Sequence, residues 1–336
     1  MIRLAWRQFR TEAMTGIGAL VVVAVVLAVT GPHIVDVYRA SPSQLTSTDH
    51  GLQIALMAAL LVVPALVGIF FGAPLIAREL ESGTFRLIFT QGVTRARWLL
   101  VKLALVGLAS SVLAGGLSLM VAWWANPINI ENANRFSLAL FGMFGIVPFG
   151  YALFAFALGA STGLLSRRTL PAMATTLVGY VAARLAVTFW VRPHFAAPLT
   201  NSFALTANSQ FGFQGSPSGL QVVVQNPSIP NAWVLSTAVA DRAGHAPTTA
   251  FLSKACPGVV GGAQRASVGK GAVGKGAFLG QMQQCFTAIA AKFHGVVTYQ
   301  PASRYWSFQS YETALFVALA LVLAGLSVWW VRKQLT

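Results

Sequence analysis

The chain is poor in charged residues, above all in acidic ones, and in cysteine. Charged residues make up 9% of its 336 residues, against roughly 25% in an ordinary soluble domain. Hydrophobic residues make up 56%, so the shortage of charge excludes a soluble globular fold, intrinsic disorder and a coiled coil. The class that remains is a polytopic helical membrane protein, in which apolar runs of about 18 residues or more are expected.

Six apolar segments are long enough to cross a hydrocarbon core of about 30 Å at about 1.5 Å per residue. They cover approximately residues 16–37, 52–77, 98–125, 136–165, 170–191 and 311–331. The predicted fold class is all-α polytopic, with six transmembrane helices after an N-terminal amphipathic interface helix over residues 1–15. A large extracytoplasmic insertion of mixed α/β or β-containing structure is predicted at residues 192–310, and residues 311–336 form the sixth span and a basic tail.

Basic residues lie unevenly around these segments. With the N-terminus in the cytoplasm, twelve of them flank the cytoplasmic ends: Arg3, Arg7, Arg10, Arg78, Arg86, Arg95, Arg97, Lys102, Arg167, Arg168, Arg332 and Lys333. The short outer loops carry only Arg39 and Arg135. Because loops rich in Lys and Arg stay inside, this bias predicts a multi-pass protein with both termini in the cytoplasm.

The first residues combine apolar and basic side chains at helical spacing. Trp6 and Phe9 are apolar, while Arg3, Arg7 and Arg10 are basic, which is typical of a helix that lies in the membrane interface. A cleaved signal peptide is the alternative, because a basic start before an apolar run has the same form. No good small-x-small cleavage site follows, which favours a retained segment.

The long block at residues 192–310 is too polar to cross a membrane. Residues 220–225 and 232–240 have the pattern of strands, and the Gly-rich stretch 257–280 predicts a mobile loop. Basic residues outnumber acidic ones in this block. They form either a solvated surface beside anionic lipid head groups or a surface that attracts an anionic partner.

Both cysteines of the chain, Cys256 and Cys285, fall in the same block. An extracytoplasmic face is oxidising, so we predict a disulfide between them; two unpaired thiols are the alternative. In the chain-entropy model, closing a loop of about 30 residues stabilises the fold by about 3–4 kcal/mol.

The sequence contains no complete motif for catalysis or metal binding. Residues 269–276 nearly match a phosphate-binding loop, but Gly276 stands where Ser or Thr should bind magnesium. No two of the five histidines have metal-ligand spacing. We therefore predict no metal site, no catalytic residue and no cofactor in the chain itself.

The segment between the second and third spans is the most charge-rich stretch of the chain. Gly83 is suited to end a helix, and Thr84 is suited to cap a short following helix over residues 85–89. The apolar side chains of that helix would be covered either by a groove on a soluble protein or by lipid head groups. Physical arguments alone do not separate the two.

This segment resembles the corresponding loop of ABC-2-type exporter permeases, particularly short actinobacterial ones. The shared pattern is Glu79-x-Glu81-x-Gly83-Thr84, followed by Thr90-Gln91-x-Val93-Thr94-Arg95-x-Arg97. The basic amphipathic start, six spans, long segment before the sixth span and basic C-terminus match the same family, with a type V exporter-like architecture. The block at 192–310 is larger than in the simplest members.

The resemblance implies the permease subunit of an ATP-driven exporter in a bacterial plasma membrane. A second permease chain, identical or paralogous, would pair with this one. Two copies of a separate ATP-binding subunit would hold ATP and Mg. They would contact a coupling loop over residues 78–97 through Arg78, Glu79, Glu81, Gly83, Thr84, Phe85, Arg86, Thr90, Gln91, Arg95 and Arg97. The implied substrate is a hydrophobic or amphipathic drug, secondary metabolite, peptide or lipid.

In such exporters the second and fifth spans usually line the central cavity. The resemblance therefore implies the pathway candidates Phe70, Phe71, Tyr180, Arg184 and Phe189, with packing or lipid contact as the alternative for each aromatic residue. Arg184 lies about 10 Å from the outer end of its span, and a buried Arg needs a partner or water. We predict Glu312 as that partner; an anionic group of a substrate is the alternative.

Two pairs of glycines have the spacing of close helix contacts. Gly68-x-x-x-Gly72 and Gly159-x-x-x-Gly163 allow helix backbones to approach and are compatible with dimerisation. Two other classes of function compete with a permease: a membrane-anchored enzyme and a sensor or scaffold, each acting through the block at 192–310. Turnover by the chain alone would indicate the enzyme, and ligand binding independent of ATP would indicate the sensor.

Overall fold

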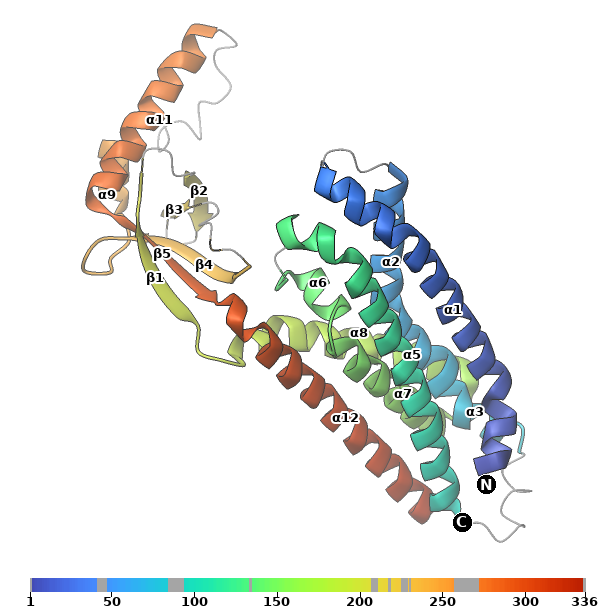
Figure 1. Cartoon of the computed structure of the whole chain (residues 1–336). Coiled ribbons are helices and arrows are strands. Elements are labelled where there is room, and N and C mark those ends of the chain that lie inside the picture. The colour runs from blue at the N-terminus through green and yellow to red at the C-terminus, as the bar shows by residue number, and fades with distance from the viewer. Residues whose placement is uncertain are drawn as a thin grey trace. The chain divides into compact units, whose positions relative to one another are not determined.

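The computed structural model describes residues 2–40, 47–83, 94–132, 135–206, 211–216, 219–224, 229, 231–256 and 272–334 (Figure 1). The described residues are mostly helical, with small antiparallel sheets in the C-terminal half. The chain divides into two compact units. Met1–Phe195 with Ser303–Thr336 is the bundle, and Ala196–Ala302 is the insertion.

The bundle contains the six apolar helices that the sequence predicts. In the described part of the chain, the candidate membrane spans are Met14–His33, Gly51–Glu81, Ala96–Ala125, Val147–Ser166, Thr169–His194 and Ala302–Lys333. The elements that form them are α1 (Ile2–Ala40), α2 (Ser47–Leu66), η2 (Val67–Gly72), α3 (Ala73–Glu81), α5 (Arg95–Asn132), α7 (Val147–Ser166), α8 (Thr169–Ala186), η3 (Val187–Val191), η4 (Arg192–His194), η5 (Ala302–Arg304) and α12 (Tyr305–Gln334). Two spans contain a π-helical segment, η2 in the second and η3 in the fifth.

The predicted interface helix is continuous with the first span. Residues 2–15 form the start of α1, which runs without a break to Ala40. The side chains of residues 1–13 lie outside the described part, so Arg3, Trp6, Arg7, Phe9 and Arg10 stay predictions.

The fourth span begins later than predicted. A separate helix, α6 (Leu138–Met143), is capped by Ser137, whose Oγ accepts the N–H of Leu140 at 3.3 Å. The chain then breaks, because Gly145 takes a φ of +83° and Pro148 lies in the first turn of α7. The prediction of one helix over residues 136–165 is therefore wrong at its start. The apolar composition of this stretch gives no sign of the break, which glycine permits and a helix-initiating proline favours.

The second and fourth spans approach each other through glycine. A Cβ on Gly68 would lie 2.6 Å from the carbonyl O of Ala155, and one on Gly159 would lie 2.3 Å from the carbonyl O of Gly68. A Cβ added to Gly72 or to Gly163 would likewise lie 2.5 Å from a backbone carbonyl O. The two glycine motifs do make the predicted close contact. Since they meet within one chain, they give no support to dimerisation.

Hydroxyl pairs also join α7 to its neighbours. Ser161 and Ser327 place their Oγ atoms 2.9 Å apart, which links α7 to α12. Thr162 and Thr176 place their Oγ1 atoms 2.7 Å apart, which links α7 to α8. Such pairs satisfy polar groups where water is scarce.

The described part of the insertion contains two antiparallel sheets and two helices. Strands β1 (Leu199–Ala204), β5 (His294–Gln300) and β4 (Trp233–Ala240) form one sheet in the order β1-β5-β4, and β2 (Phe211–Ser216) pairs with β3 (Gly219–Val224). The helices are α9 (Thr249–Ala255) and α11 (Ala272–Lys292). The predicted strands at 220–225 and 232–240 correspond to β3 and β4; β1, β2 and β5 were not predicted.

The predicted disulfide between Cys256 and Cys285 is present. It joins the end of α9 to the middle of α11, and both cysteines are buried with Leu252, Val239 and Ile289. The prediction of a loop over 257–280 is wrong for residues 272–280, which begin α11, while residues 257–271 lie outside the described residues. The same helix continues through Cys285 and Ile289, which are buried, and their packing stabilises it despite the glycines.

A tight turn follows β4. The backbone N–H groups of His245 and Ala243 donate to Asp241 Oδ1 at 2.9 and 2.8 Å. These hydrogen bonds to the charged form hold the pKa of the Asp241 carboxyl below its usual value.

Candidate functional site

Polar and charged residues gather at two ends of the bundle. We call the end from which the insertion departs the insertion end, and the end where α3 stops and α5 begins the loop end. Each end contains carboxylates that the sequence singled out, Glu312 at the first and Glu79 with Glu81 at the second.

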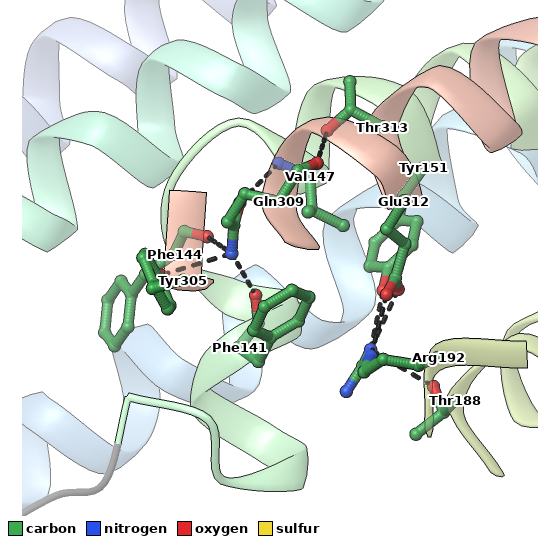
Figure 2. A network of polar contacts seen from close by, with 10 residues as sticks. All are labelled: Phe141, Phe144, Val147, Tyr151, Thr188, Arg192, Tyr305, Gln309, Glu312 and Thr313. Atoms are coloured by element: carbon green, nitrogen blue, oxygen red, sulfur yellow. Dashed lines mark hydrogen bonds and ion pairs between the residues drawn. The ribbon is translucent and has the colours of Figure 1, made fainter. Parts of the chain in front are cut away.

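At the insertion end, Arg192 and Glu312 form a buried, two-pronged ion pair (Figure 2). Arg192 Nε donates to Glu312 Oε2 at 2.7 Å, and its Nη2 donates to Oε1 at 2.8 Å. The hydroxyl of Tyr151 also donates to Glu312 Oε1. The pair joins the fifth and sixth spans with the geometry that gives the strongest carboxylate hydrogen bonds.

The Arg192 guanidinium is held from other sides as well. Its carbon lies 4.3 Å from the centroid of the Phe141 ring, which α6 supplies. Thr188, one turn earlier, places its Oγ1 3.4 Å from Nη2. The predicted extracytoplasmic block 192–310 begins with Arg192, yet this side chain is 2% exposed and lies inside the bundle.

Gln309 of α12 fills the break between α6 and α7 (Figure 2). Its Oε1 accepts the N–H groups of Ile146 and Val147 at 3.1 and 3.2 Å. Its Nε2 donates to the carbonyl oxygens of Phe141 and Phe144 at 2.9 and 3.1 Å. One amide thus satisfies backbone groups that a broken helix leaves without intrahelical partners.

The structure contradicts the predicted pairing of Arg184 with Glu312. Glu312 pairs with Arg192, while Arg184 lies over the ring of Tyr151, with its guanidinium carbon 4.7 Å from the ring centroid. Arg184 Nη1 lies 3.4 Å from the carbonyl O of Leu61 and 3.5 Å from the hydroxyl of Tyr180. The guanidinium therefore contacts α2, α7 and its own helix, α8.

The other pathway candidates do not all gather around Arg184. Tyr180 is buried beside it, whereas Phe70 and Phe189 are 58% and 54% exposed on the bundle surface. Phe71 packs against the core and lines an apolar cavity of about 210 Å³ between the first three spans. The structure thus brings together Tyr180 and Arg184 and leaves the three phenylalanines elsewhere.

At the loop end, Glu79 and Glu81 tie three spans together. Glu79 accepts a hydrogen bond from Lys102 Nζ of α5, and Lys102 also lies 4.9 Å from the Trp98 ring centroid. Glu81 Oε2 accepts the backbone N–H and the hydroxyl of Thr169 at 3.2 and 2.7 Å. Thr169 begins α8, so the carboxylate lies where a helix N-terminus favours negative charge.

The remaining coupling-loop candidates are only partly described. Arg78 and Arg97 are exposed, and Gly83 takes a φ of +72°, which suits its predicted role in ending a helix. Thr84, Phe85, Arg86, Thr90 and Gln91 lie outside the described residues, as does the side chain of Arg95. The sequence analysis did not predict Lys102 and Thr169 as partners of Glu79 and Glu81. These residues are far apart in sequence, and only the fold brings the starts of α5 and α8 beside the end of α3.

Among the described residues, no group of three His, Cys, Asp or Glu side chains could hold a metal ion.

Comparison with known protein families gives a match to this chain. Residues 17–192, more than half of the chain, match the family model described as ABC-2 membrane transporter related. The matched region starts inside α1 and ends at Arg192, so it covers nearly all of the first five spans. Neither a curated protein nor a solved structure matches the chain.

Proposed function

The chain belongs to the ABC-2 membrane transporter related family, and from this we propose that it is the permease of an ATP-driven exporter. The family match over residues 17–192 is the observation that carries the proposal. With its six apolar helices the chain is a multi-pass membrane protein and a transport component. The proposal adds direction, substrate class and partners: outward movement of a hydrophobic or amphipathic molecule by a pair of permease chains with a type V-like architecture.

In the proposed orientation, the loop end and both termini lie in the cytoplasm. The excess of basic residues flanking that end supports this orientation. The disulfide supports it too, because structural disulfides persist on the oxidising side of a membrane. The insertion is then extracytoplasmic.

The proposed docking site for the ATP-binding subunit is the segment 78–97. Two copies of that subunit, each with ATP and Mg, would press on this segment in the paired permease. The hydrogen bonds from Lys102 to Glu79 and from Thr169 to Glu81 support a role of this segment in coupling. Because they join the base of the segment to the third and fifth spans, a displacement of the segment would pass to three spans together.

Co-purification tests the proposal. We expect the tagged chain, expressed with the neighbouring gene for a Walker-motif protein, to retain that ATP-binding subunit through detergent extraction. Replacing residues 85–89 with alanine and serine should abolish retention, since the apolar groups that would enter a groove are lost. The purified chain alone should have no ATPase activity.

Arg242→Gln provides a matched control. This residue is exposed in the insertion, so the substitution should leave retention unchanged. Full retention after replacement of residues 85–89 would reject the docking segment. ATP hydrolysis by the chain alone would reject the permease assignment itself.

A further inference from the structure

Arg184 lies inside the fifth span without an acidic partner among the described residues. Its guanidinium contacts the face of Tyr151, the carbonyl O of Leu61 at 3.4 Å and the hydroxyl of Tyr180 at 3.5 Å. These are long distances for a charged donor, which normally bonds oxygen at about 2.7–2.9 Å. A guanidinium has five N–H donors in a planar fork, so most of its capacity remains unused by these contacts.

The carboxylate of Glu312, which the sequence suggested as the partner of Arg184, is already engaged. Both oxygens of Glu312 accept from Arg192, and one accepts from Tyr151 as well. Two guanidinium groups therefore contact Tyr151, and the Glu312 carboxylate pairs with that of Arg192. A cation within a span is costly and requires a counter-charge or water. Because Glu312 is paired with Arg192, it does not provide this counter-charge to Arg184.

The surroundings of Arg184 fit an amphipathic molecule. Arg184 is half-buried, so a ligand can reach it. Leu177 and Val181 precede it at i−7 and i−3 on the same face of α8, and each is 43% exposed. Leu61 of α2, whose carbonyl contacts Arg184, is also 43% exposed. If the anionic head group of such a molecule bound Arg184, the apolar part of the molecule would lie along these side chains.

We propose that Arg184 binds the anionic group, a phosphate or carboxylate, of an amphipathic molecule that lies along α8 and α2. This inference deepens the proposed function, on which it rests for the idea that the bound molecule is transported. The anionic group belongs either to a free substrate or to a membrane lipid, and both share the chemistry that a guanidinium recognises.

Probe binding to the purified full-length chain tests the inference. The probes are pyrene-labelled dodecyl phosphate, the matching alcohol and the matching trimethylammonium, measured in phosphatidylcholine nanodiscs by energy transfer from tryptophan. Wild type should bind the phosphate about tenfold more tightly than the alcohol, as expected for charge-assisted hydrogen bonds. Arg184→Gln should remove this preference, and Arg184→Lys should keep most of it.

Two controls separate recognition from folding. Arg135→Gln removes an exposed cation near α6 and should leave the preference unchanged. Arg184→Gln should leave the melting midpoint unchanged or raise it, because it removes a cation without an acidic partner. Equal binding of phosphate and alcohol by wild type, or a preference that survives Arg184→Gln, would overturn the inference.

Repeating the measurement with phosphatidylglycerol in the nanodiscs identifies the source of the anion. Competition by this lipid in wild type, absent in Arg184→Gln, assigns the site to lipid phosphate. Undiminished probe binding assigns it to a free amphipathic anion. Neither arm needs an ATP-binding subunit, so failure of the proposed docking segment and failure of this site give different results.

Discussion

Arg192 and Glu312 are oppositely charged side chains buried side by side, 2% and 0% exposed. Burial makes each charge dependent on the other, because an isolated ion loses its hydration without compensation. We expect Arg192→Met to lower the free energy of unfolding by about 3 kcal/mol. The double variant Arg192→Met/Glu312→Leu should recover most of that loss, since it leaves no lone charge.

Unfolding in mixed detergent micelles measures both variants. Arg135→Gln serves as the control, because it removes an exposed basic residue of the same bundle. A double variant as unstable as the single one would show that the lone Glu312 charge is not the cause. A single variant as stable as wild type would contradict the burial argument.

Sequence alone indicated that Arg184 needs a partner and proposed Glu312, which pairs with Arg192 instead. The two arginines are eight positions apart, which is about 12 Å along a helix. Glu312 lies at the insertion end of its span, so depth favours Arg192. The predicted span 170–191 includes η3 but ends one residue before Arg192, and no sequence pattern shows that the fifth span continues through η4.

Gln309 allows a second prediction at this scale. Gln309→Leu would leave the N–H groups of Ile146 and Val147 and the carbonyls of Phe141 and Phe144 without their amide partner. Each buried backbone group left unsatisfied costs about 1–3 kcal/mol, so we expect a loss of at least about 2 kcal/mol in the free energy of unfolding.

Ser310→Ala is the neighbouring control, because Ser310 is exposed and bonds only its own helix among the contacts described. It should change stability by less than about 0.5 kcal/mol. Equal effects of the two substitutions in the same unfolding measurement would mean that the break between α6 and α7 does not depend on Gln309.

Among the elements, the close contact of the second span with α7 depends on the absence of side chains. In an exposed helix, replacing Gly by Ala stabilises by up to about 1 kcal/mol. At Gly159 the new Cβ would lie 2.3 Å from the Gly68 carbonyl O, so the backbones would have to separate. We expect Gly159→Ala to lower the melting midpoint, although it raises helix propensity.

Gly325→Ala is the matched control on α12, where an added Cβ meets nothing within 4 Å. It should raise the midpoint slightly or leave it unchanged. If Gly159→Ala stabilised the protein as much as Gly325→Ala, the backbones of the two spans would have room that the structure does not show.

The spans were predictable because apolar length alone decides them. The start of the fourth span was not, since the break at Gly145 is repaired by Gln309, more than 160 positions later. Strand β5 was missed for a related reason: its alternation in His294–Gln300 follows directly on a helix, and its partners β1 and β4 lie far away in sequence. Long-range pairing rather than local propensity creates these elements.

At the scale of the whole molecule, the disulfide leaves no free cysteine among the described residues. Both cysteines of the chain are in that bond. A single cysteine introduced elsewhere would therefore be the one thiol available for labelling. This property allows a test of the proposed orientation, which the charge bias and the disulfide support.

Ser82 and Ser236 offer a matched pair for that test. Ser82 ends the second span at the loop end and Ser236 lies in β4 of the insertion, and both are exposed. In intact cells, a membrane-impermeant maleimide should label Ser236→Cys and leave Ser82→Cys unlabelled. Permeabilised cells should label both, while the wild-type chain should stay unlabelled throughout. Labelling of Ser82→Cys alone in intact cells would reverse the orientation and place the segment 78–97 where no cytoplasmic ATP-binding subunit can reach it.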